Sequence, residues 1–150
     1  MKNVLFLMLP LVLFFLASCE KDAIEPTKTD ILTNAAWKIT SMTIADTDGI
    51  EFEIIGDLES CELDNLHYFK STGSFVINEN TLKCEDEDPQ EYAAGSWALS
   101  QNDTRLVIAV DDESKVCDIL QLDANKIKFK YVETDEELTS TYSITMTAVK

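Results

Sequence analysis

Apolar and polar residues alternate along the chain from Ile31 onward, with the period of two that is typical of β-strands. In Lys126 to Val132, three lysines alternate with Ile127, Phe129 and Tyr131. Each strand therefore has one face for a core and one for solvent, which favours antiparallel over parallel pairing. The final segment, Leu138 to Val149, sets the apolar series Tyr142, Ile144, Met146 and Ala148 against Thr141, Ser143, Thr145 and Thr147.

About eight strands are expected, nearly all of them joined by short loops. In the first strand the apolar series changes parity between Ile39 and Met42, which predicts a β-bulge. Gly73 is placed to take the positive φ of a hairpin turn. The only room for a helix is Asp57 to Asn65. The remaining expected strands are Ala36 to Asp46, Tyr68 to Lys70, Ser74 to Asn78, Gly95 to Ser100, Arg105 to Val110 and Lys115 to Leu122.

These elements predict an all-β fold, an antiparallel eight-stranded up-and-down barrel with one short helix. A closed barrel buries the apolar face of every strand and removes the exposed edges of an open sheet. A two-sheet sandwich is the alternative. We expect residues 31–150 to form this barrel as a single domain, because a chain of that length can bury about two-thirds of its unfolded surface.

The first 18 residues have the order of a secretory signal peptide. Lys2 gives a positive start, and the apolar run from Val4 to Leu16 is shorter than the roughly 20 residues of a membrane-spanning helix. Leu16-Ala17-Ser18-Cys19 resembles a bacterial lipobox, in which the cysteine becomes the first residue and carries a multiply acylated anchor that includes palmitate. We therefore expect a signal peptide over 1–18, and a lipidated N-terminus with a polar tether over 19–30.

The acidic net charge of the chain limits the kinds of molecule that it can bind. The chain has 12 basic and 28 acidic residues, a formal net charge of −16. Lys2 is the only charged residue of the leader, so the rest of the chain carries 11 basic and 28 acidic residues, a balance of −17. This balance argues against nucleic acid and anionic lipid surfaces as partners. We expect a monomer that meets the membrane through its lipid anchor.

The sequence predicts neither an enzyme nor a metal site. Its single histidine is His67, and no serine or cysteine lies in a recognisable nucleophile motif. The acid pairs Asp86 with Asp88 and Asp111 with Asp112 fall in expected loops, where carboxylates are ordinary solvated residues. Asp46-Thr47-Asp48-Gly49 begins like a calcium loop but lacks its closing glutamate, and one histidine with oxidised cysteines cannot complete a zinc site. No cofactor is expected.

Several residues together carry a resemblance to a known family. They resemble the small lipocalin-like lipoproteins common in Bacteroidetes over roughly Ile31 to Val149. The resemblance implies a small barrel outside the cell, on the outer membrane. Glu20-Lys21-Asp22 looks like the charged signal that sends some such lipoproteins to the cell surface. The residues that carry the resemblance are Trp37, Cys61-x-x-Asp64-Asn65, Phe69, Gly73, Phe75, Cys84, Asp88-Pro89-Gln90 and Gly95-Ser96-Trp97-Ala98-Leu99.

With Cys19 lipidated, three cysteines remain in an oxidising compartment, where disulfides persist. We pair Cys61 with Cys84, because both lie in irregular segments that flank one hairpin and because the family resemblance places its two cysteines there. Alternation within the strand from Lys115 to Leu122 puts Cys117 on the apolar face with Ile119. We expect Cys117 to be a small buried residue rather than a reactive thiol.

The inner face of the barrel is the candidate site. An eight-stranded barrel is just wide enough to be filled by side chains or to hold one small ligand. A ligand-binding barrel would make the chain an outer-membrane lipoprotein that binds a small hydrophobic molecule. The alternative is a solid barrel that contacts an envelope protein or glycan through loops such as Glu85 to Ala94, with Tyr92. The side chains expected to line the interior are Trp37, Phe75, Trp97, Phe129, Tyr142 and Ile144.

Overall fold

The computed structural model describes residues 25–135 and 138–149. The signal peptide predicted for residues 1–18, and Cys19, lie outside the described residues. Within them the helices are short: α1 (Lys28–Thr33), α2 (Ser60–Asp64) and a 3-10 turn, η1 (Ile55–Asp57). The strands are β1 (Ala36–Ala45), β2 (Glu51–Glu53), β3 (Leu66–Phe69), β4 (Ser74–Asn78), β5 (Glu91–Ser100), β6 (Arg105–Val110), β7 (Glu113–Leu122), β8 (Lys126–Asp135) and β9 (Leu138–Val149).

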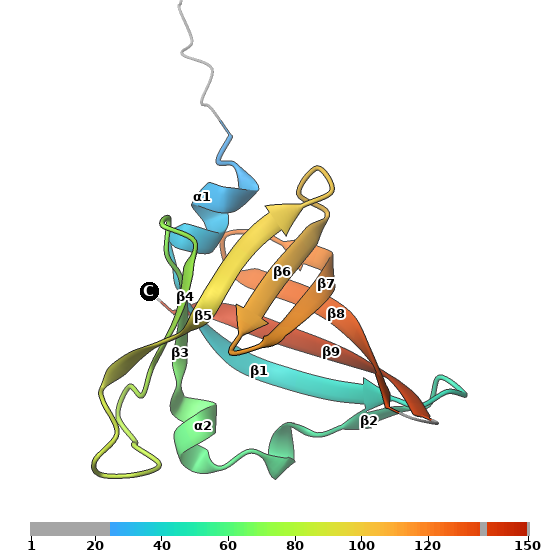
Figure 1. Cartoon of the computed structure of the whole chain (residues 1–150), viewed down its shortest axis with the longest axis horizontal. Helices are drawn as coiled ribbons and strands as arrows, with labels where there is room; N and C mark the ends of the chain where they lie inside the picture. The colour runs from blue at the N-terminus through green and yellow to red at the C-terminus, as the bar shows by residue number, and fades with distance from the viewer. Residues whose placement is uncertain (1–24, 136–137, 150) are drawn as a thin grey trace, which may run out of the picture.

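The strands form a closed antiparallel barrel (Figure 1). From β3 to β9 each strand pairs with the next, and β9 returns to pair with β1 along most of its length. β1 also meets β3 through the pair Trp37 and His67, which completes the ring of eight. The predicted eight-stranded up-and-down barrel is confirmed. β2 is a ninth short strand that pairs with the far end of β1 at Thr43 to Ala45.

The bulge in β1 and the turn between β3 and β4 lie where the sequence predicted them. The register of β1 against β9 shifts between Ile39 and Ser41, which confirms the predicted bulge. Gly73 has a φ of +87° in the β3–β4 turn, as expected. β5 begins at Glu91 and not at Gly95 as predicted, because the backbone before Gly95 pairs with β4 beyond a second register shift.

A helix stands where the sequence predicted the end of the tether. We expected an unstructured segment up to Asp30, yet α1 begins at Lys28. Thr27 and Asp30 form a capping box: the Thr27 hydroxyl accepts from the Asp30 N–H at 3.1 Å, and the Asp30 carboxylate accepts from the Thr27 N–H at 2.9 Å. Six residues are too few to show a helical apolar period, which is why the pattern missed α1. The predicted helix within residues 57–65 is present as α2.

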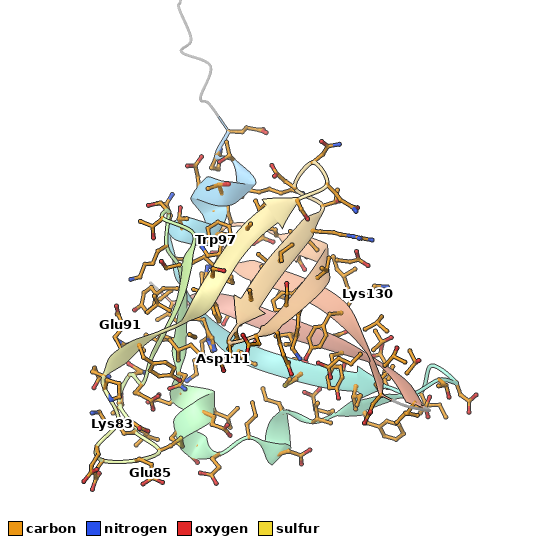
Figure 2. The ribbon with its side chains drawn as sticks, in the orientation of Figure 1. Lys83, Glu85, Glu91, Trp97, Asp111 and Lys130 are labelled. Carbon is orange, nitrogen blue, oxygen red and sulfur yellow. A yellow bond between two sulfur atoms is a disulfide. The ribbon has the colours of Figure 1, made fainter. Side chains whose placement is uncertain are left out.

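α1 closes one end of the barrel. Leu32 of α1 is fully buried and packs in the core with Trp37, Phe69 and Trp97. The Trp37 indole Nε1 donates to the Leu32 carbonyl oxygen at 2.9 Å, so the helix is held by a buried hydrogen bond as well as by packing. Figure 2 shows Trp97 toward the α1 end and Asp111, in the β6–β7 turn, toward the opposite end. No helix among the described residues is both long and apolar enough to cross a membrane.

Candidate functional site

An apolar pocket lies inside the barrel, beyond the aromatic side chains of the closed end. Its volume is about 170 Å³. The pocket is built from every second residue of the strands, since these side chains share the inner face. Its residues are Ile39, His67, Phe75, Ile108, Lys115, Cys117, Phe129, Tyr131, Ile144 and Met146.

The residues expected to line one cavity occupy three levels along the barrel. Phe75, Phe129 and Ile144 line the apolar pocket and are buried. Trp37 and Trp97 belong to the closed end, where each indole donates to a backbone carbonyl oxygen; for Trp97 this is Lys70 at 2.9 Å. The two tryptophans therefore form the floor beneath the pocket.

Tyr142 lies at the rim and not in the pocket. It is half-buried and stacks on Tyr131, with ring centroids 5.1 Å apart and ring planes 8° from parallel. Burial, with the nearby Glu133 carboxylate, raises the pKa of Tyr131 to about 12. Tyr131 is therefore neutral at physiological pH, and the stacked pair offers flat apolar faces at the entrance.

The rim also carries an ion pair. Lys115, which lines the apolar pocket, pairs with Glu133 across β7 and β8 and lies 3.9 Å from Glu113. Its ammonium sits over the Tyr131 ring, 5.0 Å from the centroid. The hydrogen bond to Glu133 raises the pKa of Lys115, so this side chain stays charged. Lys115 shares the inner face of β7 with Cys117, and cross-strand charge pairing holds its ammonium group at the rim.

A second, polar hollow adjoins the apolar pocket. Its volume is about 340 Å³, and it shares Ile39 and His67 with the apolar pocket. We call it the acidic hollow because three of its residues are carboxylates and no lysine or arginine is among the described residues that border it. Its residues are Ile39, Leu58, Glu62, Asn65, His67, Ile77, Glu79, Cys84, Asp88 and Tyr92.

His67 stands where the two spaces meet. Its Nδ1 lies 3.2 Å from the Trp37 carbonyl oxygen, and its ring stacks on Phe75 with centroids 5.9 Å apart. Burial lowers the pKa of His67, an effect that the hydrogen bond to Trp37 only partly offsets. His67 is therefore a buried neutral ring that borders both spaces.

Glu79 and Asn65 are the residues that sequence reasoning missed. Glu79 is only 4% exposed, and its Oε2 has no hydrogen-bond partner among the described residues. The same holds for the buried Oδ1 of Asn65. Glu79 continues the inward series of Phe75 and Ile77, so the period of two could have found it had the strand been extended by one residue.

The disulfide forms one wall of the acidic hollow. Cys61 and Cys84 are bonded, which confirms the predicted pair, and Cys84 borders the hollow. The bond ties α2 to the segment between β4 and β5. Among the described residues, the one group of three potential metal ligands within 4.8 Å is Glu59, Cys61 and Cys84, and two of these are consumed by the disulfide.

Cys117 lines the apolar pocket as a free thiol and is 1% exposed. Burial raises its pKa to about 11. The small buried residue predicted from the sequence is therefore what the structure contains, and it borders the apolar pocket.

No protein-family model matches this chain, and no curated protein sequence matches it.

Proposed function

We propose that this chain is an outer-membrane lipoprotein whose barrel binds a small hydrophobic ligand. The observation that carries the proposal is the apolar pocket of about 170 Å³ within a barrel that is closed at its α1 end. An apolar cavity of about 150 Å³ is enough to bind a molecule of the size of benzene. Burial of the ligand's apolar surface would supply the affinity, at about 25 cal/mol per Å².

The ligand enters from the end opposite α1. A hollow of about 600 Å³ lies beside the β6–β7 turn and shares Ile108 and Lys115 with the apolar pocket. The apolar pocket alone is smaller than the roughly 300 to 1,000 Å³ of ordinary ligand sites. We therefore expect only the apolar end of the ligand to fill it, with the rest in a neighbouring space.

The membrane anchor is proposed from the sequence. Lipidation of Cys19 would leave the segment 19–27 between the lipid and α1, a reach of about 30 Å when fully extended. The tether would hold the barrel off the membrane without fixing its orientation. A Cys19→Ser variant is expected to move from the outer-membrane fraction to the soluble fraction. Continued membrane association of that variant would contradict the anchor.

Native mass spectrometry tests the ligand. Residues 20–150, which contain the whole barrel, are incubated with a lipid extract of the producing cell. We expect a one-to-one adduct, whose mass gives the ligand class. Cys117→Phe fills the apolar pocket without changing charge and should abolish the adduct, whereas Thr29→Ala, on the exposed face of α1, should keep it. Equal adducts on both variants would place binding outside the barrel.

A second function is favoured by exposed apolar side chains on the strands that extend past the mouth. Phe52 of β2 is 52% exposed and Leu138 of β9 is 56% exposed. Such side chains suit a contact with an envelope protein or glycan, as in the interaction module that the sequence left open. The absence of any adduct in the experiment above would favour this function over ligand binding.

A further inference from the structure

We propose that the ligand of this barrel is an amine, whose ammonium group occupies the acidic hollow with Glu79 as its main partner. This inference rests on the proposed function and adds the chemistry of the polar end of the ligand.

One carboxylate oxygen of Glu79 is buried and unpartnered. Glu79 is 4% exposed, and its Oε2 accepts no hydrogen bond from the described residues. A buried acceptor without a donor destabilises the fold, and more so when it is charged. The Oδ1 of Asn65, which borders the same hollow, lacks a donor too. A ligand that brings several N–H donors would satisfy both oxygens.

The acidic hollow is lined by negative charge. Glu62 and Asp88 border it together with Glu79, and no lysine or arginine among the described residues does. His67 contributes no positive charge, because burial keeps its ring neutral. The chain as a whole carries a net charge of −16. A carboxylate or phosphate would meet repulsion here, whereas an ammonium group would be attracted.

The size of the acidic hollow favours an organic cation over a bare metal ion. A bare metal ion needs its ligands close together, yet Glu62, Glu79 and Asp88 do not form a group within 4.8 Å of one another. The hollow of about 340 Å³ has room for an organic ammonium group. Since Ile39 and His67 border both spaces, a molecule can place its ammonium group in the acidic hollow and its apolar body in the pocket.

Three probes with one apolar body test the inference. Residues 20–150 are titrated by calorimetry with 2-phenylethylamine, 2-phenylethanol and 3-phenylpropanoate, which differ in the charge of the polar end. We expect the amine to bind at least tenfold tighter than the alcohol, and the carboxylate to bind most weakly. Glu79→Gln should remove the preference for the amine and leave the affinity for the alcohol within about twofold.

Asp103→Asn is the matched control. It removes one negative charge from an exposed turn at the α1 end, so it should leave the affinity for the amine unchanged. Equal binding of the three probes to the unaltered chain, or loss of amine affinity in both variants, would overturn the inference but keep the proposed function. If none of the three probes binds, the proposed function itself fails.

Discussion

Nδ1 of His67 lies 3.2 Å from the carbonyl oxygen of Trp37, in the residue pair that joins β3 to β1. A carbonyl oxygen can only accept, so Nδ1 carries a proton. Because burial lowers the pKa of the ring, His67 is neutral and its Nε2 is left as an acceptor. The contact links the floor of the barrel, which Trp37 forms, to the boundary between the apolar pocket and the acidic hollow.

The neutral state of His67 predicts a loss of stability in mild acid. Burial lowers its pKa in the folded chain, so the unfolded chain binds the proton first as the pH falls below about 6.5. The stabilisation is complete above that pH and declines below it, by at most about 1.4 kcal/mol per pH unit for one proton. Urea unfolding at several pH values between 7 and 5 measures this decline in the free energy of unfolding.

His67→Gln is the control for this effect, because glutamine can donate to the Trp37 carbonyl oxygen but does not titrate. The slope of stability against pH should vanish in the variant. Asp30, Asp64 and Asp123 do not interfere, since hydrogen bonds lower the pKa of each carboxyl below its ordinary value. An unchanged slope in His67→Gln would show that another group is responsible.

Cys117 should resist thiol reagents until the barrel unfolds. Its pKa is raised from 9.0 to about 11 by burial, which lowers the thiolate fraction at pH 8 by about 100-fold before access is considered. Labelling with a disulfide reagent at pH 8 is expected to be complete in urea and negligible without it. Rapid labelling of the folded chain would mean that the pocket opens often to solvent.

Reduction of the disulfide should weaken the fold. Cys61 and Cys84 are 23 residues apart, and under the chain-entropy model a loop of that size contributes about 3 kcal/mol. Urea unfolding with and without a reductant should show this difference. The double variant Cys61→Ala, Cys84→Ala should have the same free energy of unfolding as the reduced chain, with or without reductant. A reductant-dependent stability in this variant would show that the reductant acts on something other than the disulfide.

Gly95→Ala should be among the most damaging single substitutions. Gly95 has a φ of +155°, and a Cβ there would lie 1.9 Å from the carbonyl oxygen of Ala109 on the paired strand β6. We expect a loss of at least about 3 kcal/mol, or failure to fold. Gly56→Ala is the matched control, because no atom lies within 4 Å of its Cβ position. Equal thermal stability of the two variants would contradict this close approach of β5 and β6.

The alternation of residues was enough to predict the barrel, but not the depth of each side chain within it. Parity gives the face on which Trp37, Phe75 or Tyr142 lies, and all three are on the inner side or rim. Their level along the axis depends on strand tilt and stagger, which parity does not encode. For that reason the residues expected to line one cavity lie at three levels: the floor, the apolar pocket and the rim.

Two other features escaped prediction for different reasons. α1 is fixed by the capping pair Thr27 and Asp30 and by the single buried contact of Leu32, a signal too short to stand out in the sequence. Glu79 lies one residue past β4, where a carboxylate is normally solvated, yet it is buried at the acidic hollow beside residues of α2, β3 and the segment between β4 and β5.

The most direct test of the account is whether the apolar pocket takes up a small apolar molecule. Isoleucine methyl groups are labelled for NMR, and residues 20–150 are titrated with benzene. We predict saturable shifts for the pocket residues Ile108 and Ile144, with Ile50, which is 55% exposed beyond the mouth, unaffected. Shifts confined to Ile50, or none at all, would contradict a ligand site inside the barrel.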